Sequence, residues 1–239
     1  MKKATVKRLA SIVGLSILLV GCTTKPSTET QEAGTGTANV VGGWTVYEDN
    51  APQLTSDEQK RFEEALEGLT GVGYTPIQVL ASQLVSGNNY AYLAKGTTVT
   101  AQPKISYYVV VIYEDLQGKK ELKTIKEIDL ADIKVLDNKA EGLLGGWQVP
   151  ADRKGSLPQE ASASFEKATQ KLMGVSLNPL ALLGTQVVSG TNYIAICEGT
   201  TTTQNPTPAL YVLKWYEDLQ KNVEVLDNSI LDLEYYVTE

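Results

Sequence analysis

Few side chains of this sequence could carry out covalent or metal chemistry. The chain contains no histidine, which removes the commonest general base and the commonest metal ligand. Its two cysteines, Cys22 and Cys197, are too few for a zinc site or a disulfide framework, and Cys197 falls in an apolar run that predicts a buried free thiol. The acidic pairs Glu114-Asp115 and Glu217-Asp218 have suitable types for acid–base catalysis, but adjacent residues of a strand point apart. We therefore expect a binding protein with no metal and no cofactor, not an enzyme.

The overall composition is that of a folded acidic protein. The chain has 239 residues, of which 42% are hydrophobic, and this length suits one large domain or two small ones. Its formal net charge of -7 repels phosphate backbones, so we expect no nucleic-acid partner.

The N-terminus has the pattern of an export signal. Four basic residues within residues 1–8 precede an apolar run at 9–20, and Gly21 and Cys22 follow directly. This order resembles the lipobox of bacterial lipoproteins, which implies a signal peptide at 1–21 and a lipid on Cys22. An ordinary signal peptide that ends near a cysteine is the alternative. The resemblance implies an extracytoplasmic protein attached to the cell membrane or outer membrane through its lipid, and the polar residues 22–39 read as a flexible tether.

The rest of the chain is an internal repeat. Segments in the two halves match at a constant spacing of 103 residues: Gly42-Gly43-Trp44 with Gly145-Gly146-Trp147, 83–87 with 186–190, and 113–117 with 216–220. A period of this length fits a small domain rather than a solenoid unit. We therefore expect two domains of the same fold, at 40–138 (repeat one) and 139–239 (repeat two).

Each repeat shows one helical pattern followed by extended segments. Ser56 and Gln59 have the spacing of a capping box, and apolar residues follow at helical spacing up to Leu69; Ser156 and Gln159 match them in repeat two. Runs rich in β-formers come next, at 75–85, 90–95 and 105–113 in repeat one. The last run is apolar on both faces, so one face should cover the helix while the other is either open aromatic surface or a contact with the sister domain. The predicted class is α+β, with each antiparallel sheet wrapped on one helix.

One motif occurs in both repeats between two predicted strands. Gln83-Leu84-Val85-Ser86-Gly87 and Gln186-Val187-Val188-Ser189-Gly190 are each followed by Asn-Tyr one residue later. Their glycines tolerate positive φ, so a tight hairpin is expected. With the double glycines upstream and the helix between, these segments resemble the first inhibitory loop of cystatins, and the resemblance covers residues 40–239.

The resemblance to cystatins implies a cystatin-like fold and a wedge that fills the cleft of a papain-like cysteine protease. The segments implied to contact the protease are the trunks, the first loops and the second-loop tips: Val41, Gly42, Gly43, Leu144, Gly145 and Gly146; 83–87 and 186–190; and Leu116 and Leu219. Cystatins usually place Pro-Trp in the second loop, and this sequence has Leu116 and Leu219 instead.

Two functions from different classes follow from these patterns. The first is a lipid-anchored, reversible inhibitor of papain-like cysteine proteases. The alternative is a non-inhibitory adhesion or ligand-binding module, whose binding surface would be an open sheet face with Tyr90, Tyr92, Tyr107 and Tyr113. For both motifs, the alternative to a binding role is that glutamine and glycine merely build a hairpin.

Overall fold

The structure is a computed structural model that describes residues 43–47, 54–129, 147–148 and 157–237. All of them belong to one compact unit, Gly34–Glu239. They form nine strands and three helices. The signal peptide, the tether and Cys22 lie outside the described residues. None of the helices in the described ranges is both long and apolar enough to cross a membrane.

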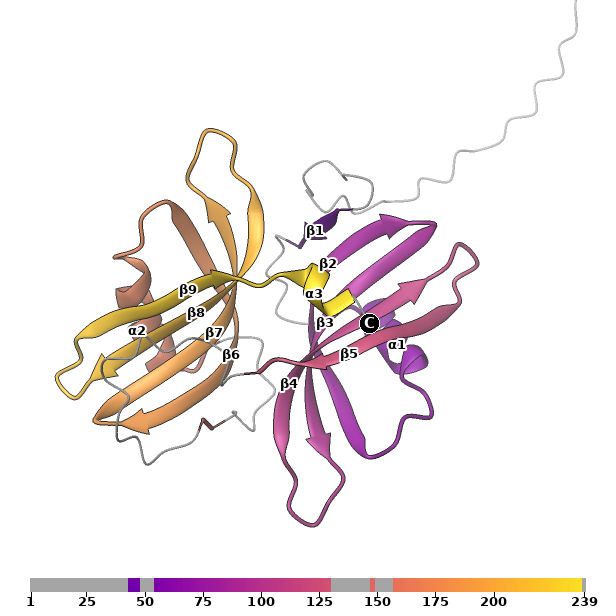
Figure 1. The fold of residues 1–239 in the computed structure, drawn as a ribbon, viewed down its shortest axis with the longest axis horizontal. Helices are drawn as coiled ribbons and strands as arrows, with labels where there is room; N and C mark the ends of the chain where they lie inside the picture. Colours follow the sequence, from indigo (N-terminus) through magenta and orange to yellow (C-terminus); the bar gives the residue numbers. More distant parts are fainter. Residues whose placement is uncertain (1–42, 48–53, 130–146, 149–156, 238–239) are drawn as a thin grey trace, which may run out of the picture. The chain divides into compact units, whose positions relative to one another are not determined.

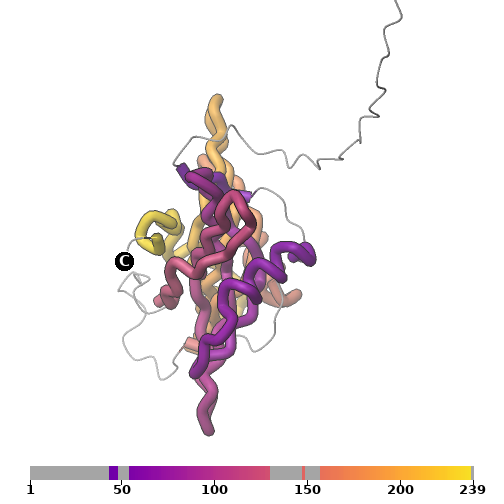
Figure 2. Tube along the Cα trace, turned by 90° about the vertical axis from the view of Figure 1, so that its right-hand side faces the viewer, coloured from indigo at the N-terminus to yellow at the C-terminus, as the bar shows by residue number. Residues whose placement is uncertain are grey.

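Repeat one forms a five-stranded antiparallel sheet in the order β1-β2-β3-β4-β5 (Figure 1). Its elements are β1 (Trp44–Val46), α1 (Ser56–Ala65), β2 (Val72–Val85), β3 (Gly87–Thr98), β4 (Ile105–Glu114) and β5 (Lys120–Glu127). Helix α1 lies alongside the strands of this sheet in both views (Figures 1 and 2). The three extended runs predicted from the sequence correspond to β2, β3 and β4, each of which is longer than predicted.

Repeat two has the same succession of one helix and four antiparallel strands. It comprises α2 (Gln159–Thr169), β6 (Val175–Val188), β7 (Gly190–Thr201), β8 (Pro208–Asp218), β9 (Val223–Ile230) and the short α3 (Leu233–Val237). The sheet order is β6-β7-β8-β9, and a bridge between Gln148 and Thr185 stands where β1 pairs with β2 in repeat one. Register shifts after Pro76 and after Val79 recur after Pro179 and after Leu182. The internal repeat of the sequence is therefore a structural repeat down to its β-bulges.

The start of α1 differs from the prediction by one residue. The N-cap is Thr55, whose side chain accepts a hydrogen bond from the backbone of Glu58, while the Glu58 carboxylate accepts from the backbone of Thr55. This capping box replaces the predicted Ser56–Gln59 pair. In repeat two the helix begins after Pro158 without a side-chain cap, and Ser156 lies outside the described residues.

The predicted class α+β, with each sheet wrapped on one helix in a cystatin-like layout, is wrong. Antiparallel strands dominate both repeats, and the three helices have 10, 11 and 5 residues. Helix α1 ends at Ala65, short of the predicted stripe, so Leu69 is exposed and Phe62 is the buried residue of the helix. The chain then turns through Gly68 and Gly71, both at positive φ, into a strand of 14 residues. The protein is mainly β because these strands are long and its helices are short.

Each sheet is buried on both faces. Val110 and Ile112 pack with Phe62 under α1, whereas Val109 and Val111 belong to a cluster that also contains Leu183, Ile194 and Ile196 of repeat two. The Tyr107 hydroxyl donates a hydrogen bond of 2.9 Å to the carbonyl of Leu182 within this inter-sheet core. The run at 105–113, which is apolar on both faces, therefore covers the helix with one face and contacts the sister repeat with the other.

Candidate functional site

The two hairpins of each sheet end side by side. In repeat one the β2–β3 hairpin turns at Ser86, with Val85 paired to Gly87, and the β4–β5 hairpin turns at 115–118. We call residues 83–87 with 114–118 end one, and the equivalent residues 186–190 with 217–221 end two. Because β2 and β4 run in the same direction, both turns of end one lie at the same end of the strands (Figure 1).

A tyrosine joins the two turns of each end. The Tyr113 hydroxyl donates to the Ser86 carbonyl at 2.5 Å, and the Tyr216 hydroxyl donates to the Ser189 carbonyl at 2.5 Å. Gly87 has a φ of +130°, and a Cβ atom there would collide with the carbonyl oxygen of Glu114. The two hairpins of an end therefore form one packed unit in which the glycine cannot be replaced without strain.

The glutamine that opens each motif faces inward. Gln83 is 9% exposed, and its Oε1 accepts a hydrogen bond of 2.7 Å from Asn89 Nδ2 on the neighbouring strand. Gln186 accepts the same bond from Asn192 at 2.9 Å. At both positions the glutamine bonds within its own hairpin, and the exposed large apolar residues of the motifs are ones that follow it.

Large apolar side chains are exposed at both ends. Leu116, at the apex of the β4–β5 turn, is 80% exposed, and its equivalent Leu219 is 73% exposed. Leu84, Val85 and Val187 are also among the exposed large hydrophobic residues. Since apolar residues at a strand tip gain nothing from solvent exposure, this concentration marks a surface suited to docking.

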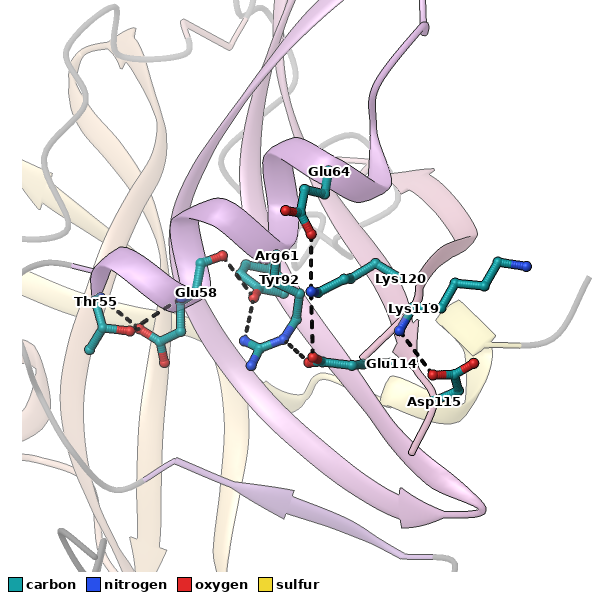
Figure 3. Close-up of polar contacts among 9 residues, drawn as sticks. All are labelled: Thr55, Glu58, Arg61, Glu64, Tyr92, Glu114, Asp115, Lys119 and Lys120. Atoms are coloured by element: carbon teal, nitrogen blue, oxygen red, sulfur yellow. Dashed lines mark hydrogen bonds and ion pairs between the residues drawn. The ribbon is translucent and has the colours of Figure 1, made fainter. Parts of the chain in front are cut away.

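The acidic residues of end one are occupied in shaping it. Asp115 Oδ1 accepts backbone hydrogen bonds from Gln117 and Lys119, both at 2.9 Å, and so closes the turn. Glu114 accepts a hydrogen bond of 2.6 Å from Arg61 Nε on α1 (Figure 3). Asp218 closes the turn of end two in the same way, with bonds from Gln220 and Asn222. These carboxylates therefore take part in the bonds that shape the two ends.

Arg61 was missed in the sequence analysis. Its guanidinium also donates to the Tyr92 hydroxyl at 3.1 Å and lies 3.9 Å from the centre of the Tyr90 ring. Burial lowers its pKa, but the bonds to Glu114 and Tyr92 outweigh burial and raise the pKa of Arg61 above its ordinary value. A comparison of the two repeats could have pointed to Arg61. At the 103-residue spacing, Ser164 stands in place of Arg61 and Trp215 in place of Ile112, and Ser164 and Trp215 are hydrogen-bonded to each other.

The chain matches no protein-family model and no curated protein with significant similarity. The assignment of a function therefore rests on the two ends themselves.

The predicted trunk residues fall mostly beyond the described ranges. Gly43 precedes β1, whose Trp44 pairs with Gln83, so the start of β1 lies beside end one. Five other trunk residues lie outside the described residues: Val41, Gly42, Leu144, Gly145 and Gly146. Of the predicted contact residues, the structure thus brings together 83–87 with Leu116, and 186–190 with Leu219.

The remaining candidate groups have structural surroundings. Cys197 is fully buried, as predicted, and burial raises the pKa of its thiol. Within the described ranges, no group of three or more His, Cys, Asp or Glu residues is arranged to hold a metal ion. Tyr92 and Tyr107 are buried, Tyr90 lies under Arg61, and Tyr113 binds Ser86. These four tyrosines therefore do not form one open sheet face.

Proposed function

We propose that the protein is a reversible inhibitor of papain-like cysteine proteases, and that each end fills a protease cleft without being cut. The observation that carries the proposal is the exposed apolar tip formed by Leu84, Val85 and Leu116, and repeated by Val187 and Leu219. Both motifs resemble the first inhibitory loop of cystatins, and they stand at these tips.

The contacts within each end support a role in binding. The hairpins are joined by the Tyr113–Ser86 and Tyr216–Ser189 bonds, and their turns are closed by Asp115 and Asp218. A surface held in shape before binding loses little conformational entropy when it binds. Because Glu114 is paired with Arg61 and Asp115 is bonded within its turn, the acidic residues add little repulsion at the tip.

A steady-state inhibition titration of residues 23–239 against papain-like proteases tests this proposal. Wild type should inhibit reversibly and in competition with substrate. The double substitution Leu116→Asp and Leu219→Asp should weaken inhibition by at least about tenfold, since a buried leucine contributes about 1.5–3 kcal/mol to binding. The matched control is Val99→Asp with Met173→Asp, because these apolar residues are also exposed, at 75% and 95%, but lie at the opposite ends of the strands. Equal inhibition by both double variants would contradict the proposal.

We also propose that lipid on Cys22 holds the protein at a membrane on the extracytoplasmic side. The proposal rests on the lipobox pattern of the sequence. Cys22→Ser should leave the protein unprocessed or released from the membrane fraction. Unchanged fractionation, with cleavage at another site, would contradict this assignment.

A further inference from the structure

The two ends are alike in shape, but they are attached to the rest of the molecule differently. Each has a glutamate at the base of its second turn, Glu114 in end one and Glu217 in end two, 103 residues apart. Glu114 and Glu217 have different cationic partners.

In end one the cation comes from the helix. Arg61 Nε of α1 donates to Glu114 Oε2 at 2.6 Å, and the side chains of Arg61 and Glu114 are only 14% and 22% exposed. Tyr92, which receives a second bond from Arg61, donates in turn to the carbonyl of Glu58 at 3.1 Å. Figure 3 shows Arg61 lying between α1 and the strand that carries Glu114. The base of end one is therefore fixed to α1 by a largely buried network.

Glu114 stands where the two hairpins of end one meet. It pairs with Asn88 on β3 and with Lys120 on β5, and its carbonyl oxygen packs against Gly87. Lys120 reaches Glu64 of α1 at 3.0 Å and Glu114 at 3.7 Å, which adds a second link to the helix. A displacement of Glu114 would therefore move both turns together.

In end two the cation comes from the turn itself. The side chain of Lys221 is 69% exposed, and its Nζ binds Glu217, whose side chain is 8% exposed, at 2.7 Å, four residues away. Ser164 occupies the position equivalent to Arg61 and accepts a hydrogen bond of 2.9 Å from Trp215 Nε1. The helix of repeat two thus packs against the strand through Trp215. Lys167 Nζ of α2 also donates to the carbonyl of Lys221 at 3.2 Å, so this helix reaches end two through the backbone of its turn and not through Glu217.

We propose that Arg61 is a positioning residue: through Glu114 it ties end one to α1 and so holds both turns of end one in place. Where the proposed inhibitory function holds, loss of Arg61 then weakens binding through end one and leaves binding through end two unchanged.

Amide hydrogen exchange of residues 23–239 tests the positioning role without any protease. Arg61→Gln should speed exchange at Asp115 and Gly118 by about tenfold or more, because the turn loses its link to the helix, and leave Asp218 and Lys221 unchanged.

Two further variants make the result specific. Arg61→Lys keeps the charge and should restore part of the protection of end one, whereas Ser164→Ala should leave the protection of end two unchanged. If Arg61→Gln does not fold, Glu114→Gln should give the same local effect at Asp115 and Gly118. Unchanged exchange at end one, or equal acceleration in the central strands β3 and β7, would overturn the proposal.

An inhibition series separates this proposal from the proposed function, on which its binding consequence rests. In a chain whose end two carries Leu219→Asp, adding Arg61→Gln should raise the inhibition constant by about tenfold. If wild type inhibits no papain-like protease but the exchange result holds, the inhibitory function is refuted and the positioning role stands. If wild type inhibits and exchange at end one does not change in Arg61→Gln, the positioning role is refuted.

Discussion

At the scale of single residues, the glycine of each motif tolerates no side chain without strain. Gly87 and Gly190 have φ of +130° and +139°, and a Cβ atom would meet the carbonyl of Glu114 or Glu217. Both the backbone angle and the contact exclude a side chain, so these glycines hold the two turns of an end together.

Substituting these glycines should destabilise the protein. We expect Gly87→Ala to lower the free energy of unfolding by about 1–3 kcal/mol, because it adds backbone strain and separates the hairpins. Gly73→Ala is the control. Gly73 lies in β2 without a positive φ, and the nearest atom to a Cβ added there would be the carbonyl oxygen of Thr97 at 3.8 Å. Urea unfolding measures both. Equal stability of the two variants would contradict the contact between Gly87 and Glu114.

The sequence predicted the tips of the hairpins but not the direction of each side chain. A glutamine, a valine and a glycine in order indicate a turn, yet the inward position of Gln83 follows from its pairing with Asn89 across the strands. Likewise, the partner of Glu114 lies 53 residues away, on α1. Such long-range partners are beyond local patterns, although the exchange of Arg61 for Ser164 between repeats points to them.

At the scale of elements, the helix was predicted in the right place but with the wrong cap and too great a length. The capping pattern permits a start at Thr55 or at Ser56, and the reciprocal bonds of Thr55 and Glu58 decide between them. The helical stripe was extended to Leu69, but Gly68 and Gly71 turn the chain before that. These errors, together with the underestimated strand lengths, produced the wrong fold class.

The cap can be tested by one pair of substitutions. Thr55→Ala should lower the free energy of unfolding by about 0.5–2 kcal/mol, because it leaves backbone N–H groups of the first turn without an acceptor. Ser56→Ala should be neutral or slightly stabilising, since Ser56 lies inside the helix and alanine is the better helix former. Thermal unfolding of both variants distinguishes a cap at Thr55 from a cap at Ser56. A larger loss of stability for Ser56→Ala than for Thr55→Ala would refute the observed cap.

At the scale of the whole molecule, the largest apolar cluster joins the two repeats. Side chains from both sheets share it, and Leu233 and Tyr236 of α3 belong to it as well. The carbonyl of Tyr236 accepts a hydrogen bond of 2.5 Å from Thr124 on β5, so the end of repeat two binds the sheet of repeat one. The repeat could be predicted from the sequence, but the packing of the two sheets against each other could not, because an apolar face alone does not indicate which surface covers it.

Separation of the repeats should expose this shared face. Residues 40–138 alone would present Leu93, Val109 and Val111 to solvent, and we expect them to self-associate at concentrations of about tens of micromolar. Light scattering after size-exclusion chromatography measures the mass of this half and of residues 23–239. A monomeric half with the thermal stability of the full chain would show that the inter-sheet core contributes little.

Alkaline pH should weaken the fold in a defined range. Burial raises the pKa of Tyr92, Tyr107 and Tyr236 to about 12. The unfolded chain therefore releases these protons first, above pH of about 10, so the free energy of unfolding falls as pH rises from about 10 to about 12. Tyr107→Phe should make this decline shallower. It should also cost about 1–3 kcal/mol at neutral pH, because the buried carbonyl of Leu182 loses its donor. Urea unfolding at several pH values measures both, and an unchanged slope would contradict the burial of Tyr107.

The central claim is that Leu116 and Leu219 enter the cleft of a papain-like protease, and calorimetric titration with the double variant Leu116→Trp and Leu219→Trp tests it most directly. The larger aromatic surface should tighten binding by about tenfold, equivalent to about 1.4 kcal/mol, and a protease whose cleft is already filled by a covalent peptide inhibitor should not bind. Wild type that fails to bind several papain-like proteases at about 100 μM, or that binds the filled protease as tightly as the open one, would contradict the account.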